Sequence, residues 1–339
     1  MAQMIKQQCS MFFNALNRHQ RLLELALDGT NIGRTGCTAL ANLLTNPESR
    51  IIKLRLEAND FDNYAITTFS NALRYRNALV SLNFAGDLHE PSRITAVGWR
   101  AFVSIFTTRT CSIEDFFLRR IRICNEGMNS LVNALAINGT LKYLQIGLVM
   151  SLTPAGWKAV AMCLRNPDTA IEELNLNESM IDSDGMVAIL TALATNSTVK
   201  RLNIARTDIA DEKVREALSH LLCDETSFDS TRMSNHTLNT IRWRDKPLDQ
   251  DLGHSIAFYL KMNRNRNKLK VARRKSLIHH FSGVILVRRI LSRIPESIFP
   301  YALSWICQDR YGLCAMYNVV HAFPTLFLQV NNARKKRKF

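Results

Sequence analysis

The chain has 339 residues, of which 47% are hydrophobic and 22% charged, a composition that excludes an intrinsically disordered protein. Its formal net charge of +15 lies at one end, because residues 1–240 hold 24 basic and 24 acidic side chains whereas residues 241–339 hold 20 and 5. This split predicts a neutral module followed by a basic one. The sequence contains no apolar run long enough for a membrane span and does not begin like a secretion signal, so we expect an intracellular protein in the cytoplasm, with the nucleus as the alternative.

A pattern of the form LxxLxL, followed by a further apolar residue, recurs from residue 22 to about residue 238. Four copies match it closely and four match it weakly. The copies begin at Leu22, Ile51, Leu79, Ile113, Leu141, Ile171, Val199 and Phe228. Their starts are separated by 29, 28, 34, 28, 30, 28 and 29 residues, a regularity that indicates a repeat rather than chance clustering.

Each copy combines two periodicities. The leucines alternate with period two, which predicts a short strand, and the residues that follow are spaced by four, which predicts a helix. The clearest helical run is Ile181, Gly185, Ile189 and Leu193. A helical run without a preceding strand is formed by Met4, Gln8, Phe12 and Leu16, so we expect a half-repeat at residues 4–21. Units of one strand and one helix bury their apolar faces only by stacking on one another.

The repeat resembles the ribonuclease-inhibitor class of leucine-rich repeats, over roughly residues 4–240. The resemblance implies an α/β fold: a right-handed leucine-rich-repeat solenoid, or horseshoe, with a parallel sheet inside and helices outside. About eight repeats would occupy residues 22–240. Function stays open at this point, because this architecture hosts many roles.

The residues between the leucines of each strand face the concave side of such a solenoid. The predicted concave surface carries both signs of charge and has two aromatic residues near its middle, which favours a protein partner over nucleic acid. The candidate contacts on the strands are Arg55, Glu57, Phe117, Arg119, Tyr143, Gln145, Glu173, Asn175, Arg201 and Asn203, and Arg232 is expected in the same columns. Solvated strand positions are the alternative for each of them, and Phe117 either anchors a ligand or marks an irregular strand.

The third repeat carries about five extra residues, at positions 88–93, between its strand and its helix. Irregular loops on a rigid scaffold often hold binding groups. We therefore expect residues 88–93 and 119–122 to form one rim of the partner site, with His89 and Arg93 as candidate contacts. A tolerated surface insertion is the alternative.

After Trp243 the composition changes, and residues 241–330 are predicted to form a basic helical module that caps the last repeat. Its basic segment, which contains no acidic residue, comprises Lys261, Arg264, Arg266, Lys268, Lys270, Arg273, Arg274 and Lys275. Residues 331–339 are expected to be a disordered basic tail. Within it Lys335, Lys336, Arg337 and Lys338 resemble a nuclear-localisation signal, and a solvated tail or a contact with RNA, DNA or acidic lipid are the alternatives.

Chemical motifs are missing from the sequence: it has no P-loop, no GxSxG, no HExxH and no dinucleotide glycine fingerprint. The histidines at 279 and 280 have no cysteine or carboxylate at ligand spacing along the chain. The eight cysteines contain no CxxC pair and are interpreted as buried free thiols. We therefore expect no catalytic residue, no cofactor and no metal.

Taken together, these patterns favour a monomeric, non-catalytic scaffold that binds an unidentified protein through the concave face and the adjacent loops. One alternative is a regulator of a small GTPase, because activators of Ran-type GTPases use similar repeats, although those proteins typically end in an acidic tail and this one ends in a basic tail. A second alternative is an adaptor that binds nucleic acid or an anionic membrane through residues 261–275.

Overall fold

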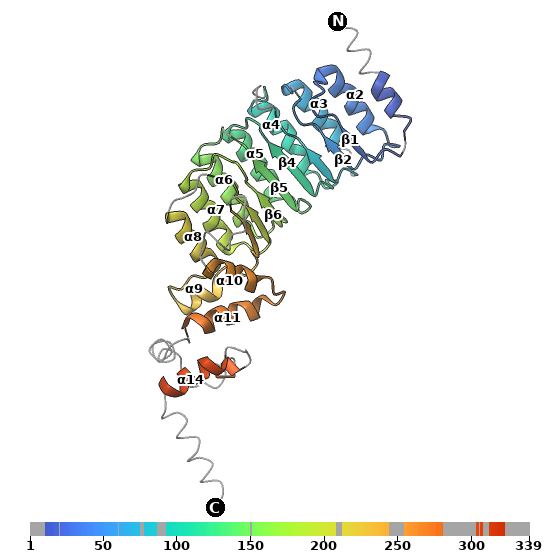
Figure 1. Cartoon of the computed structure of the whole chain (residues 1–339). Helices are drawn as coiled ribbons and strands as arrows, with labels where there is room; N and C mark the ends of the chain where they lie inside the picture. The colour runs from blue at the N-terminus through green and yellow to red at the C-terminus, as the bar shows by residue number, and fades with distance from the viewer. Residues whose placement is uncertain are drawn as a thin grey trace, which may run out of the picture.

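The computed structural model describes residues 11–19, 21–59, 61–74, 78–86, 93–149, 151–207, 212–243, 254–280, 303–304, 306–307 and 312–322. Strands line one side of a curved array, helices line the other, and further helices follow at the C-terminal end (Figure 1). Within the described ranges, no helix combines the length and the apolar character that a membrane span requires.

In the part of the chain that the structure describes, the strands form a single parallel sheet of eight strands in sequence order. The strands are β1 (Glu24–Ala26), β2 (Lys53–Arg55), β3 (Ser81–Asn83), β4 (Asp115–Arg119), β5 (Tyr143–Gly147), β6 (Glu173–Asn175), β7 (Arg201–Asn203) and β8 (Thr240–Arg242). The helices are α2 (Gly33–Thr45), α3 (Asn63–Arg74), α4 (Ala96–Val103) with the 3₁₀ helix η1 (Ser104–Thr107), α5 (Asn125–Ala136), α6 (Pro154–Arg165), α7 (Ser183–Thr195), α8 (Glu212–Leu222), α9 (Phe228–Met233), α10 (His254–Asn263), α11 (Lys268–His280) and α14 (Gly312–Ala322). This is the predicted leucine-rich-repeat solenoid.

The core lies between the sheet and the helices. The strands pair in register, so that their central residues form one continuous column across the sheet. This column consists of Leu25, Leu54, Leu82, Phe116, Leu144, Leu174, Leu202 and Ile241, and all of its members are buried. Because side chains alternate along a strand, the residues on either side of this column face away from the core.

Glycines in α5 and α7 let neighbouring helices approach closely. A Cβ at Gly127 of α5 would lie 2.8 Å from the indole ring of Trp99 in α4, and a Cβ at Gly185 of α7 would lie 3.0 Å from Cβ of Trp157 in α6. Both tryptophans are fully buried. The small residue of the helical pattern is therefore a packing requirement between successive repeats.

Asparagine side chains, most of them buried, close several of the turns between helices and strands. In one turn, the Nδ2 atom of Asn196 donates to the carbonyl of Leu164 in the preceding repeat (2.8 Å). Its Oδ1 atom accepts hydrogen bonds from the amides of Thr198 and Val199 (3.0 and 2.8 Å). Side chains that likewise donate to a carbonyl outside their own turn are Asn138, Asn166, Asn235 and Asn263. Each such amide joins one repeat to the repeat before it.

The predicted start of the eighth repeat at Phe228 is wrong. Residues 228–233 form α9, and the strand of this repeat is β8. The central residues Leu202 and Ile241 are 241 − 202 = 39 residues apart, whereas Leu174 and Leu202 are 202 − 174 = 28 residues apart. An insertion of 39 − 28 = 11 residues therefore precedes the eighth strand. Arg232 lies on α9 and not on the concave surface.

Helix α10 belongs to the eighth repeat by its spacing. Asn263 at its end follows Ile241 by 263 − 241 = 22 residues, and Asn196 follows Leu174 by 196 − 174 = 22 residues. A domain boundary at residue 240 would cut through β8, so the repeated pattern extends to residue 263.

Helix α11 covers the end of this array. It contacts α9 and α10, and Val271 and Leu277 on it are buried. The ammonium group of Lys275 on α11 is also buried, and it donates to the carbonyl oxygens of Leu222 and Asn235. Helix α14 contacts α11 in turn.

The first described helical residues are 11–16, within the predicted half-repeat. Phe13 is buried, whereas Phe12, which the spacing predicted as apolar core, is exposed. The prediction therefore fails at Phe12, whereas Leu16, the next residue of the predicted run, packs against the core. Asn46 at the end of α2 donates to Asn17 (3.2 Å), which holds this segment against the first complete repeat.

The expectation that all cysteines are buried is wrong. Cys37, Cys163 and Cys223 are buried, but Cys124, Cys307 and Cys314 are exposed. Cys124 precedes α5, where its sulfur accepts a hydrogen bond from the amide of Gly127 and caps the helix. Burial raises the pKa of the Cys37 thiol to about 12.

Replacing Gly127 by alanine should lower the free energy of unfolding by about 1 kcal/mol, because overpacking against Trp99 outweighs the gain in helix propensity. Gly139→Ala is the matched control, since a Cβ there would meet no atom within 4 Å, and its effect should be within about 0.5 kcal/mol. Urea unfolding of the two variants measures both values. Equal stability of the two variants would contradict the proposed packing role.

Candidate functional site

The concave surface is built from strand residues that flank the buried central column. The first such column comprises Glu24, Lys53, Ser81, Asp115, Tyr143, Glu173, Arg201 and Thr240, and the second comprises Ala26, Arg55, Asn83, Phe117, Gln145, Asn175, Asn203 and Arg242. Arg242 occupies the place that the sequence analysis gave to Arg232. The middle of this surface lies on β4 and β5, which are five residues long, whereas the other strands have three residues each.

An aromatic pair occupies this middle region. Phe117 is half-buried between the fully buried Phe116 and Leu118, so the strand has the predicted phase and Phe117 faces the concave side. Its ring lies 4.9 Å from the ring of Tyr143, centroid to centroid. The Tyr143 hydroxyl accepts a hydrogen bond from Asn175 (3.0 Å). Burial raises the pKa of Tyr143, so the hydroxyl keeps a proton that it can donate to a partner.

Charged residues of both signs flank the aromatic pair. Arg201 of β7 forms an ion pair with Glu173 of β6 through Nε and Oε2 (2.5 Å). On the other side, burial and the neighbouring Glu114 raise the pKa of Asp115. Further along the sheet, Arg55 pairs with Asp28 (2.6 Å). Because these groups are partly exposed, each pair contributes only about 0–1 kcal/mol to stability, and their main effect is to order the surface.

A second set of ion pairs follows the carboxyl ends of the strands. Glu178 lies between Arg119 (3.9 Å) and Arg206 (3.1 Å), which come from two other repeats. Arg120 pairs with Glu57 (3.1 Å). Sequence reasoning placed Arg119 and Glu57 on this surface and Arg120 in the rim, but it missed Glu178 and Arg206 and did not predict the ion pairs. Arg120, Glu178 and Arg206 share a place one to three residues after a strand, where the backbone takes positive φ values of 52°, 59° and 55°.

Three predicted contacts have hydrogen bonds that fix their side chains. Gln145 is buried and donates to Oδ1 of Asn177 (3.1 Å), so it supports that side chain and is not an exposed contact as predicted. The side chains of Asn175 and Asn203 accept hydrogen bonds from backbone amides two residues later, each at 3.1 Å. These bonds turn the chain after each strand and hold the amide side chains in place.

The predicted rim loop falls largely outside the described residues. His89 is among residues 87–92, which the structure does not describe. Arg93 is exposed, and its backbone forms a parallel bridge with Asp62. Arg122 is exposed as well.

The basic segment spans the end of α10 and most of α11. Four of its side chains are exposed: Lys261, Arg264, Arg266 and Lys270. Arg273 and Arg274 are half-buried, and Lys268 is half-buried and donates to the carbonyl of Asn263 (2.8 Å). Lys275 is completely buried, so its predicted place in a polyanion-binding surface is wrong. Residues 335–338, the predicted nuclear-localisation signal, lie outside the described residues.

Comparison with known proteins gives matches at low identity. No family model matches the chain. The chain is 25% identical to mouse ribonuclease inhibitor over 64% of its own length and 45% of that protein. It is 24% identical to mouse NACHT, LRR and PYD domains-containing protein 14 over 64% of its length and 21% of that protein. It is 24% identical to human NACHT, LRR and PYD domains-containing protein 5 over 61% of its length and 16% of that protein.

The chain thus spans less than half the length of each of these relatives. The repeat spacing, the parallel sheet and the matched relatives agree on one architecture. The chain is similar to leucine-rich-repeat proteins of the ribonuclease-inhibitor type, and its fold is a leucine-rich-repeat solenoid of that type.

Proposed function

We propose that the chain is a non-catalytic scaffold that binds a protein partner on the concave surface of β4 to β7. The half-buried pair of Phe117 and Tyr143 carries this proposal. Aromatic and arginine side chains dominate the binding energy of protein interfaces, and here an aromatic centre is bordered by Arg201 and Arg119. Both signs of charge at its border suit a protein surface better than a uniformly anionic nucleic acid.

The side chains of this surface are held in fixed positions, which also supports binding. Asn175 holds the Tyr143 hydroxyl, Glu173 holds Arg201, and Glu178 holds Arg119. Side chains that are already ordered lose less conformational entropy when a partner binds. The loss of conformational entropy on binding therefore cancels less of the free energy gained from each new contact.

The similarity to mouse ribonuclease inhibitor supports a protein as the class of partner. The name of mouse ribonuclease inhibitor states that its target is a protein, a ribonuclease, and this protein matches 64% of the present chain. The similarity is too low to transfer that target. It favours a protein partner for this chain without naming one.

Tyr143→Ala should weaken partner binding by about 2 kcal/mol, or about 30-fold in Kd, because it removes the central aromatic anchor. The partner is first isolated with the intact chain from a lysate and then purified. Isothermal titration calorimetry with the purified partner gives both dissociation constants.

Arg201→Glu should also weaken binding, because it places a second carboxylate beside Glu173. Lys158→Glu is the matched control: it makes the same change in net charge at an exposed position on α6, across the solenoid from the sheet. The control should bind like the wild type. A loss of affinity in Lys158→Glu, with normal affinity in the two concave variants, would contradict the proposal.

Polyanion binding by the basic segment is a second candidate function. Lys261, Arg264, Arg266 and Lys270 are exposed around the turn between α10 and α11. We rank this function lower because Lys275 is buried and Lys268 is already hydrogen-bonded, so fewer charges are available than the sequence indicated. Regulation of a small GTPase is a prediction that the geometry neither favours nor tests.

If the polyanion function is correct, the intact chain should bind a single-stranded oligonucleotide with a log–log salt slope of about −3, because each of the four exposed cations contributes about 0.7 on a single strand. The double variant Arg264→Glu/Arg266→Glu should flatten the slope by about 1.4 units. Lys158→Glu should leave the slope unchanged. Fluorescence anisotropy at several salt concentrations measures the slope, and undetectable binding at low salt would remove this function.

A further inference from the structure

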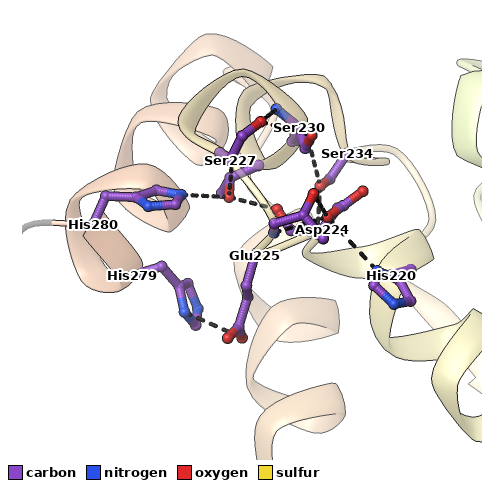
Figure 2. A network of polar contacts seen from close by, with 10 residues as sticks. His220, Asp224, Glu225, Ser227, Ser230, Ser234, His279 and His280 are labelled. Carbon is purple, nitrogen blue, oxygen red and sulfur yellow. Dashed lines mark hydrogen bonds and ion pairs between the residues drawn. The ribbon is translucent and has the colours of Figure 1, made fainter. Parts of the chain in front are cut away.

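A cysteine, a carboxylate and a histidine meet where α11 covers the end of the solenoid. Cys223 directly follows α8, Glu225 lies in the loop before α9, and His279 lies in the last turn of α11. One ligand atom from each of the three residues lies within 4.8 Å of the other two. The Nδ1 atom of His279 is 3.1 Å from Oε1 of Glu225, and Figure 2 shows the two side chains pointing toward each other.

The spacing of these atoms suits a tetrahedral metal ion. Zinc bonds of about 2.0–2.3 Å in tetrahedral geometry place neighbouring ligand atoms ~3.3–3.8 Å apart. The separation of 3.1 Å between His279 and Glu225 is close to this range, and no two of the three ligand atoms are more than 4.8 Å apart. A thiolate, an imidazole and a carboxylate together form a donor set that zinc prefers over magnesium or calcium, which require oxygen ligands.

The charges at this position are balanced for a divalent cation. Zinc binds cysteine as the thiolate, so binding releases the proton of the Cys223 thiol to solvent. Cys223 and Glu225 then together supply two negative charges that neutralise the ion. The nearby cation is Lys275, which interacts electrostatically with Cys223 while its ammonium group donates to the carbonyls of Leu222 and Asn235. The bound ion and its two anionic ligands together carry no net charge beside this lysine.

Residues around the cluster hold the ligands in position. The Tyr259 hydroxyl contacts Nε2 of His279 and is hydrogen-bonded to Cys223. Outer contacts of this kind orient the imidazole of a metal ligand. His280 is directed elsewhere, because its Nε2 atom is hydrogen-bonded to the Thr231 hydroxyl (2.8 Å).

We propose that Cys223, Glu225 and His279 bind a zinc ion, with water in the fourth position. The ion joins the end of the seventh repeat, the inserted segment before α9, and α11. It thereby fastens the covering helix to the solenoid. This site is separate from the concave surface. The zinc proposal is therefore independent of the proposed protein-binding function.

Cobalt(II) tests the site directly, because it replaces zinc and reports its ligands by absorption. The intact chain, stripped of metal with a chelator, is titrated with Co²⁺ and then with Zn²⁺. We expect one equivalent of Co²⁺ to bind with a thiolate-to-cobalt charge-transfer band in the near ultraviolet, and Zn²⁺ to abolish the band. A titration that yields no such band would overturn the proposal.

Variants assign the ligands. Cys223→Ser should abolish the charge-transfer band. Glu225→Gln changes an exposed carboxylate with little risk to folding, and it should weaken Co²⁺ binding by more than the ~10-fold expected for Tyr259→Phe, which alters only an outer contact. Cys163→Ser, at a buried thiol on α6, and His220→Asn, at an exposed histidine on α8, are the matched controls and should bind like the wild type.

Thermal unfolding supplies a second measurement that does not depend on absorption. Zinc that binds the folded chain raises its melting temperature. The wild type and both controls should show this rise, and Glu225→Gln should show a smaller one. The same rise in Glu225→Gln and the wild type, together with an unchanged cobalt band in Cys223→Ser, would show that the metal binds elsewhere.

Discussion

The solenoid depends on one repeated interaction, the buried asparagine side chain at the turn from helix to strand. Such an amide donates to a carbonyl outside its own turn and accepts amides of that turn, as Asn138 and Asn196 do. Losing these bonds would leave buried backbone groups unsatisfied, at a cost of about 1–3 kcal/mol in each turn. Because the amides fix the position of each strand relative to its neighbour, the residues that flank the core fall into columns. The aligned concave surface is a consequence of this constraint.

The same interaction explains how the array ends. Asn235 and Asn263 continue the series beyond an 11-residue insertion. The fold tolerates the insertion because Asn235 again places an amide side chain at the turn before the strand. The insertion carries α9 and provides the surface on which α11 packs. Glu225 lies within the inserted segment and Cys223 immediately precedes it, so the feature that interrupts the repeat also brings the proposed zinc ligands to His279.

Much of the fold could be predicted from the sequence, because the apolar residues of the first seven repeats keep both periodicities. The prediction failed at Phe228, where apolar residues at similar spacing belong to a helix, and only tertiary contacts identify Asn235 as the true marker of the turn. The burial of Gln145 could not be predicted, since it depends on Asn177 in the next repeat. The cluster of Cys223, Glu225 and His279 was also beyond sequence reasoning, because its histidine is 279 − 225 = 54 residues from its carboxylate.

A rigid array of this kind presents a surface on which Phe117 and Tyr143 are ordered before any partner arrives. The central claim is that a partner covers these two rings. Hydroxyl-radical footprinting of the chain, alone and bound to its purified partner, measures the solvent access of individual side chains. The account predicts lower oxidation of Phe117 and Tyr143 in the complex and unchanged oxidation of Met162, which is 70% exposed on α6. Protection of Met162 with undiminished oxidation of both aromatic rings would contradict it.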